Sequence, residues 1–219
     1  MGKLPAGIPH NSPLNCVLDK CIGEQFMSGE VNLKSNIALK EWAIVCDEVL
    51  AGKQVALLRK GGILEQKKGF AIEHETFFFY PNTEHQSREQ LKPAFHARLD
   101  SYGPPARVSG KIAIAGFGRV VDIVKTTDGA KLRALEPITC WTQALFDMRI
   151  NYKPEKPNFV VTVRAYMLPR SIEVPYHEDY AGCHSWVPLK QELDAIGTPV
   201  LSDDAFEEAR AAVLKIVRE

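Results

Sequence analysis

Residues 111–125, KIAIAGFGRVVDIVK, form an apolar stretch that two glycines interrupt. Its β-branched and aromatic residues predict a strand, and Gly116 and Gly118 are typical of a strand that bends or bulges. A second strong strand is predicted over residues 158–168, NFVVTVRAYML. Strands and helices follow one another along the chain without regular alternation. We therefore predict an α+β fold with a bent, mostly antiparallel sheet or partial barrel and flanking helices.

The segments before residue 111 are predicted to form a helix and two further strands. The three-four spacing of apolar residues from Leu39 to Leu50 predicts a helix over residues 35–52. Residues 54–60, QVALLRK, and residues 70–86, FAIEHETFFFYPNTEHQ, are predicted to form a hairpin-like pair of strands. A helical segment follows over residues 87–100, which Pro93 makes short, kinked or split.

The segments after residue 125 complete the predicted domain. Residues 135–150, LEPITCWTQALFDMRI, are predicted as a helix with Pro137 in its first turn. Residues 172–189 read as a strand-and-loop return, and residues 202–219 as an amphipathic helix. We expect a loosely ordered lead-in at 1–34 and a main α+β domain at 35–189, whose best internal boundary is 101–110. Residues 190–219 are expected to supply a C-terminal helix that packs on this domain.

The composition fits an ordinary globular protein. Of 219 residues, 45% are hydrophobic and 25% are charged, and 27 Lys and Arg balance 27 Asp and Glu. The neutral total argues against a protein that wraps a long polyanion, while a local basic patch is compatible with it. The five cysteines are scattered, which is typical of reduced thiols. Because we find neither an apolar membrane span nor a signal peptide, we expect a cytoplasmic protein with no membrane partner.

The strand at residues 70–86 carries the densest polar chemistry. Glu73, His74 and Glu75 lie at its polar start, ahead of an aromatic run, and are the candidate catalytic residues. The alternative is that the two carboxylates are solvated and His74 is a half-buried, hydrogen-bonded residue. His85 and Gln86, just past the Pro-Asn turn, sit at a predicted helix start that could hold an anion. Alternatively they belong to a capping and turn cluster.

Two other stretches concentrate candidate ligand-binding side chains. Arg59 and Lys60 precede two glycines, where cations and bare backbone amides could receive a phosphate; an ordinary solvated hairpin is the alternative. Residues 182–186, GCHSW, supply Cys183, Ser185 and Trp186. The cysteine and the adjacent histidine point apart on a strand, and the spacing of a zinc site is missing. A packed corner is the alternative for this loop.

A metal-dependent nuclease of the restriction-enzyme type is an alternative function. Residues 65–67, EQK, have the spacing of such a motif but fall in a polar connection. Glu41 and either Glu73 or Glu75 would complete a carboxylate set for magnesium. Outside this alternative we expect no metal and no cofactor.

The segments ALKEWA, LLRKGG, IEHETFFFYPNTEHQ, LEPITCWT and YAGCHSW together resemble a family of uncharacterised bacterial proteins, the domain of unknown function numbered eighteen-hundred-and-two. The resemblance covers residues 36–189 and implies a single unit with no activity to carry over. The family's LEP-F-H-W-T wording appears here as LEPITCWT, with Cys140 where a histidine is expected, which argues against a catalytic role at that position. The second half is similar to the small bent barrels of the PUA and EVE group, which by analogy of fold implies the reading of RNA or modified bases.

These observations favour a cytoplasmic binding module for a nucleotide or a single-stranded nucleic acid. A non-catalytic protein-interaction domain is a further alternative, and core packing is the alternative role of each tryptophan. We expect the first hairpin and the GCHSW loop to meet, which would bring His74 and His85 to Trp186. The expected pocket combines aromatic rings for base stacking with cations for phosphate: Tyr80, Trp141 and Trp186, with Arg59, Lys60, Arg149 and Arg164.

Overall fold

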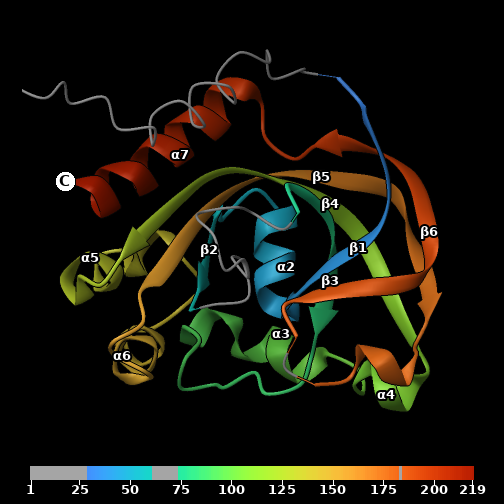
Figure 1. The fold of residues 1–219 in the computed structure, drawn as a ribbon, viewed down its shortest axis with the longest axis horizontal. Coiled ribbons are helices and arrows are strands. Elements are labelled where there is room, and N and C mark those ends of the chain that lie inside the picture. Colours follow the sequence, from blue (N-terminus) through green and yellow to red (C-terminus); the bar gives the residue numbers. More distant parts are fainter. Residues whose placement is uncertain (1–28, 61–73, 183) are drawn as a thin grey trace, which may run out of the picture.

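A ring of strands dominates the fold. The computed structural model describes residues 29–60, 74–182 and 184–219. The sheet has the order β2-β5-β4-β3-β1-β6, and β5 also pairs with β6, which closes every strand except β2 into the ring (Figure 1). The strands are β1 (Val31–Trp42), β2 (Ala56–Arg59), β3 (Thr76–Asn82), β4 (Lys111–Thr126), β5 (Asn158–Pro175) and β6 (Trp186–Pro199).

The predicted α+β class and the bent, mostly antiparallel sheet are confirmed. Among the strands in the described ranges, only β1 and β3 run parallel, and the other pairs are antiparallel. The ring is not a regular barrel, because β5 and β6 pair only at Tyr166 with Pro199 and at Met167 with Thr198.

The helices lie on both sides of the sheet. In Figure 1, α2 lies under the arch that β4 and β5 form, and α7 lies above it. None of the helices in the described ranges is long and apolar enough to cross a membrane. The helices are α2 (Ala43–Leu50), α3 (His96–Ser101), α4 (Ala106–Ser109), α5 (Gly129–Arg133), α6 (Gln143–Asn151) and α7 (Asp203–Arg218), with 3₁₀ turns at Pro93–Phe95, Glu136–Ile138 and Glu178–Tyr180.

Strand β4 is irregular at two places, and the first of them lies at Gly116. The register between β4 and β5 shifts between Ile114 and Gly116, and again between Val120 and Asp122. A Cβ atom at Gly116 would overlap the Leu50 side chain of α2 and crowd the Tyr166 carbonyl of β5. The missing side chain therefore lets the sheet bend closely around α2, as a glycine within a strand often does.

The two faces of the strands build two cores, because successive side chains point to opposite faces. One core lies between the ring strands and includes Ala38, Phe78, Phe117, Tyr166 and Val187. The other packs the opposite face against β2 and the helices, and it includes Leu39, Phe77, Phe79, Leu145 and Phe206. The site described below lies on the side of the sheet that faces the second core.

The helix predicted over residues 35–52 is wrong in its first half. Residues up to Trp42 belong to β1, and α2 begins only at Ala43. Ala38 and Leu39 are both buried, because β1 pairs with β3 and β6 and has a core on each face. A strand buried on both faces loses its alternation of apolar and polar residues and can imitate helical spacing. The strand also starts at Val31, inside the expected lead-in, and residues 1–28 lie outside the described ranges.

The predicted hairpin between residues 54–60 and 70–86 is also wrong. β2 pairs with β5, whereas β3 pairs with β1 and β4, so two strands separate them in the sheet. The parallel neighbours β1 and β3 need a crossover connection, which runs through α2 and β2. In this topology β2 lies at the edge of the sheet, apart from β3.

The helix predicted over residues 135–150 begins late. Trp141 forms an isolated bridge with Leu91, and Thr142 is an extended N-cap residue, so α6 starts at Gln143. Trp141 and Arg149 therefore do not share a helix face, as the predicted pocket required. A tertiary backbone pairing has overridden the local helical pattern here.

The remaining boundaries follow the sequence more closely. The helix predicted over residues 87–100 is shorter than expected, because helical structure begins only at Pro93 and continues as α3, and α4 forms within the predicted boundary at 101–110. Residues 190–199 continue β6, so the C-terminal helix is α7 alone. The Ser202 hydroxyl caps α7 by accepting from the Ala205 amide at 3.3 Å, and Asp203 and Asp204 are the acids of its first turn.

Candidate functional site

The ends of β1, β2 and α6 bring together Glu41, Arg59, Lys60 and Arg149, which we call the Arg59 cluster. The Arg59 guanidinium Nη2 donates to the Lys40 carbonyl at 2.8 Å and lies 3.2 Å from Glu41 Oε2. The side chains of Arg59 and Glu41 are only 12% and 10% exposed. The second Glu41 oxygen accepts from the Trp42 amide at 2.8 Å. The single carboxylate is therefore already engaged on both oxygens.

Arg149 adds a second, largely buried guanidinium to the cluster. Burial lowers the pKa of Arg149; Glu41 opposes this shift, and the like charge of Arg59 adds to it. The Nε atoms of Arg59 and Arg149 are both buried and meet no acceptor among the described residues. Glu41 thus pairs with Arg59 and acts on Arg149 through its charge alone, so two guanidinium groups face one carboxylate among the described residues.

Lys60 holds the end of α6 against β2. Its ammonium donates to the backbone carbonyls of Arg149 and Ile150, the latter at 3.3 Å. Burial lowers the pKa of Lys60, and the positive charge of Arg149 contributes in the same direction. The negative charge of Glu155 opposes this shift, so the Lys60 ammonium lies between an acid and the Arg149 guanidinium.

Trp186 and His74 form an aromatic corner close to the cluster. Trp186 pairs with Leu39 in the register of β1 and β6, two residues before Glu41. Its ring centroid lies 5.2 Å from that of His74 at an interplanar angle of 79°, and 5.5 Å from that of Phe77. The expected meeting of His74 and His85 with Trp186 holds for His74 and fails for His85. The indole Nε1 is buried and has no acceptor among the described residues.

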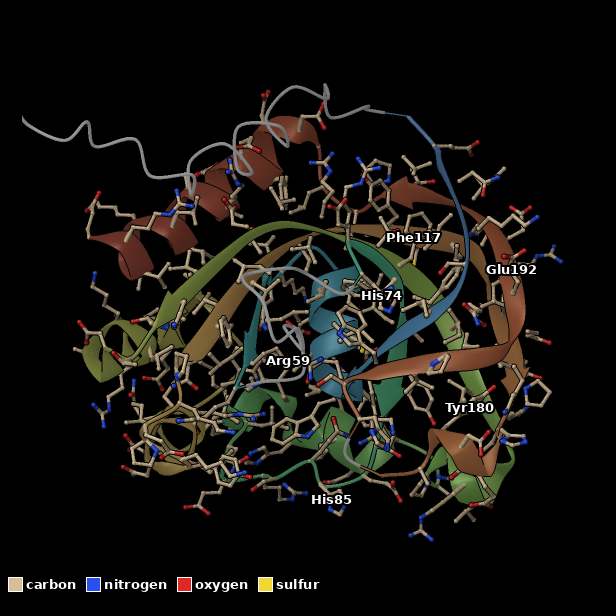
Figure 2. All side chains as sticks on the ribbon, viewed as in Figure 1. Arg59, His74, His85, Phe117, Tyr180 and Glu192 are labelled. Atoms are coloured by element: carbon tan, nitrogen blue, oxygen red, sulfur yellow. The ribbon has the colours of Figure 1, made fainter. Side chains whose placement is uncertain are left out.

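Gln86 and Thr83 lie beside the start of α2. Gln86 Oε1 accepts from the Ile44 amide at 3.0 Å, which fixes the orientation of the side-chain amide. Gln86 Nε2 and the Thr83 hydroxyl are both buried without a partner in the described part of the chain. His85, by contrast, is exposed with φ 61°, and Figure 2 places it at the lower edge of the fold, well separated from His74.

Several predicted pocket residues lie elsewhere. Tyr80 is 3% exposed inside the ring, with its ring 6.4 Å from that of Tyr180. Trp141 is 3% exposed and packs edge to face against Phe146 in the second core. Their ring faces are covered by protein, so the structure does not bring them into the Arg59 cluster.

Arg164 faces α7 and not the cluster. Its guanidinium bonds to Asp203 and to the Leu201 and Ser202 carbonyls, at 3.2 and 3.4 Å, and it lies 4.9 Å from the Phe206 ring. The side chain is 2% exposed, with each of these groups on α7 or just before it. Arg164 therefore anchors the C-terminal helix.

The remaining candidates contribute little visible chemistry. The Ser185 carbonyl accepts from the Lys40 amide at 2.8 Å, and the exposed Glu75 engages Val120 through its backbone carbonyl at 2.8 Å. Glu73 and Cys183, and the EQK triplet at residues 65–67, lie outside the described residues. Within the described ranges, no group of three or more His, Cys, Asp or Glu side chains could hold a metal ion.

Sequence reasoning missed two roles in this site. Glu41 was a magnesium candidate, whereas the structure shows it as the counter-ion of Arg59. Gln86 was an anion candidate, and its bond to the Ile44 amide has no local sequence signal because the two residues are far apart in the chain. Both roles depend on long-range pairing of strands.

Comparisons with known proteins identify a family and a distant structural likeness. Residues 38–212 match the family described as "Domain of unknown function (DUF1802)". No curated protein matches the chain significantly. The crystal structure of ASCH from Zymomonas mobilis aligns with 80% of this chain and 93% of its own, at 10% identity and a TM-score of 0.36. A tyrosine-to-phenylalanine mutant of that protein aligns over 71% of this chain and 90% of its own, at 10% identity and a TM-score of 0.38. Likeness at this level carries no argument about function.

Proposed function

The chain belongs to the DUF1802 family, and we propose that it is a binding module for a nucleotide or a single-stranded nucleic acid. The proposed phosphate site is the Arg59 cluster. One observation carries the proposal: Glu41 pairs with Arg59 and is the carboxylate that acts on the charge of Arg149, and the Nε group of each arginine has no acceptor in the described part of the chain. A bound anion would supply acceptors for both Nε groups.

The physical reason is the cost of a buried charge. A guanidinium that leaves water without a full set of acceptors loses several kcal/mol of solvation, in order of magnitude about 2–7 kcal/mol for even a neutral polar group. Arginine presents its donors as a planar fork that fits phosphate oxygens. A phosphate between Arg59 and Arg149 would supply both the missing charge and the missing acceptors.

The aromatic corner supports a nucleotide over a free inorganic anion. Trp186 lies opposite Leu39, two residues before Glu41 on β1, which corresponds to about 7 Å along the strand. A half-buried indole at this distance can stack on the base of a nucleotide whose phosphate lies at the arginines. The neutral total charge favours a short ligand over an extended duplex.

Binding is favoured here over metal-dependent cleavage. Glu41 is already paired with Arg59. Glu75 is exposed. Magnesium requires several oxygen ligands, whereas the described residues of the Arg59 cluster present mainly cationic side chains. The proposal therefore assigns the cluster to the ligand and not to a cation.

The decisive test is the Arg149→Gln variant, measured for binding and stability together. We expect affinity for a labelled short single strand of RNA or DNA, followed by fluorescence anisotropy, to fall by about tenfold to a hundredfold, because a charge-assisted hydrogen bond is lost. The thermal unfolding midpoint should stay constant or rise, because a buried like charge is removed.

The matched control is Arg133→Gln, which removes an arginine from an exposed pair with Asp147. Its affinity should equal that of the wild type. Wild-type affinity in a folded Arg149→Gln protein would refute the proposed phosphate site, and so would equal losses in the two variants.

A further inference from the structure

A cavity of about 150 Å³ lies where the end of β5 meets β6, and we call it the β5–β6 cavity. Its walls include the aromatic rings of Tyr176, His177 and Tyr180, with Lys190 and Gln191 on β6. Figure 2 places Tyr180 well apart from Arg59. Lys190 and Gln191 are exposed, so the cavity is open to solvent. In proteins a cavity of about this size holds a benzene-sized ring.

A bulge in β6 builds one wall of the cavity. The register between β1 and β6 shifts between Ser35 and Ile37, so residues 189–192 of β6 lie opposite Asn36 alone. The Lys190 amide in this bulge donates to the Tyr180 hydroxyl at 2.7 Å. Bulges commonly redirect side chains beside functional sites. The bulge therefore joins the backbone of β6 to the aromatic side of the cavity.

Tyr180 forms the fixed aromatic wall. Its side chain is buried, and its ring centroid lies 6.0 Å from that of Tyr176 at an interplanar angle of 89°. The Lys40 ammonium holds the turn behind it by donating to the carbonyls of Tyr180, at 2.5 Å, and of Gly182, at 3.0 Å. The rings of Tyr176 and Tyr180 thus form a right-angled corner, against which a flat aromatic ring can pack.

A hydroxyl donor and a cation meet on one side of the cavity. The Tyr180 hydroxyl accepts from the Lys190 amide, and within the described ranges its own proton has no acceptor. The Lys190 ammonium bonds to Asp179, the residue before Tyr180, which brings the lysine side chain to the same turn. Because this ion pair is 55% and 61% exposed, it contributes little stability and leaves the ammonium available to a ligand.

From this geometry we propose that the β5–β6 cavity binds a small aromatic carboxylate. The ring of the ligand packs in the corner of Tyr176 and Tyr180, and its two oxygens accept from the Tyr180 hydroxyl and the Lys190 ammonium. The described residues that line the cavity include the cation of Lys190 and no carboxylate, which favours an anion over a cation. The site is separate from the Arg59 cluster and does not depend on the proposed function.

The experiment titrates benzoate into the full chain and follows the backbone amides by two-dimensional NMR. We expect a saturable shift of the Lys190 amide signal, because the acceptor of that amide, the Tyr180 hydroxyl, turns its proton to the ligand. Cyclohexanecarboxylate has the same charge without a flat ring and should bind at least about threefold more weakly. Benzyltrimethylammonium should leave the signal unchanged, and tighter binding of this cation than of benzoate would overturn the proposal.

Two variants test the two donors. Tyr180→Phe should weaken benzoate binding by about tenfold or more, because a hydrogen bond to a charged group is lost. Lys190→Gln should weaken it by about threefold to fivefold. Lys190 is exposed, so this variant tests the site even where Tyr180→Phe does not fold. The matched control is Lys111→Gln, which removes an equally exposed lysine from its pair with Glu173 and should bind benzoate as the wild type does.

Arg149→Gln separates this site from the proposed phosphate site, and it should bind benzoate with wild-type affinity. Loss of benzoate binding in that variant would assign the anion to the Arg59 cluster and overturn the inference. Wild-type affinity in a folded Lys190→Gln protein would also overturn it, and so would a Lys190 amide signal that does not move with benzoate. Binding of a single strand is measured separately, so the proposed function stands or fails independently of these results.

Discussion

The Arg59 cluster differs from a second group of buried charges, the α7 docking cluster, in how fully its polar groups are bonded. The α7 docking cluster consists of Asp122, Thr162, Arg164, Asp203 and Arg210. Asp122 Oδ2 accepts from the Thr162 hydroxyl at 2.7 Å and from Arg210 Nε at 2.6 Å. Asp122 Oδ1 accepts from Arg210 Nη2 at 2.9 Å and from Arg218 Nη2 at 3.3 Å. In the Arg59 cluster the donors outnumber the acceptors.

This contrast distinguishes arginines that stabilise the fold from arginines that are available to a ligand. Arg164 and Arg149 are both embedded and both lie near an apolar core. The Arg164 guanidinium is engaged by a carboxylate and two carbonyls, whereas Arg149 keeps a buried donor without a partner in the described residues. Satisfied buried groups favour a role in stability, and unsatisfied ones favour a role in binding.

The largest expected effect is the difference between Arg164→Gln and Arg149→Gln in stability. Arg164→Gln should lower the free energy of unfolding by about 3–5 kcal/mol, because it removes a buried charge whose partners on α7 stay behind. Arg149→Gln should change it by less than about 1 kcal/mol or raise it. Urea unfolding of both variants measures this difference. An equal loss of unfolding free energy in the two variants would contradict the distinction between the two clusters.

A smaller effect is expected from Asp122→Asn, and it should depend on pH. Burial pushes the pKa of Asp122 upward, but hydrogen bonds from Arg210 and Thr162 and the charges of Arg210 and Arg218 leave it below the ordinary value of 3.8. A carboxyl group with a lowered folded-state pKa stabilises the fold above its unfolded pKa and loses this contribution as pH falls through the folded pKa.

The variant should therefore lose about 2–3 kcal/mol near neutral pH, a value reduced because Arg210 and Arg218 are 24% and 52% exposed. The gap between the two proteins should narrow below pH 3.8. Glu173→Gln, in an exposed pair with Lys111, is the control and should cost at most about 0.5 kcal/mol. A gap that stays constant down to the acid limit would show that the Asp122 charge does not hold α7.

Sequence reasoning recovered the parts of the fold that local pattern determines. The glycines of β4 predicted one of its two irregularities, and the amphipathic pattern with acids in the first turn predicted α7. Residues 35–42 were predicted wrongly because burial on both faces hides the period of a strand. The start of α6 was misplaced because Trp141 pairs with Leu91. Both errors come from contacts between segments distant in the chain.

The same limit applies to the candidate site. The sequence named Arg59, Lys60, Arg149 and Trp186, and the structure brings the first three together and places Trp186 nearby. Their role in binding stays a prediction. Arg164 was grouped with them because the sequence does not show that its side chain reaches α7. Strand pairing, and not residue type, determines to which part of the fold a cationic side chain points.

The smallest expected effect concerns the salt dependence of binding, and it tests how local the unbalanced charge is. A single strand that meets only the two guanidinium groups should release few counterions, so the logarithm of the binding constant should fall with the logarithm of salt at a slope of about −1.4. Arg149→Gln should reduce the slope to about −0.7, because one phosphate contact is lost. Arg164→Gln, in whatever fraction remains folded, should keep the wild-type slope, since Arg164 bonds only within the protein. Anisotropy titrations over a series of salt concentrations measure all three. A wild-type slope steeper than about −4 would mean that an extended cationic surface binds the strand, and the contrast between one incomplete cluster and one complete cluster would then not explain binding.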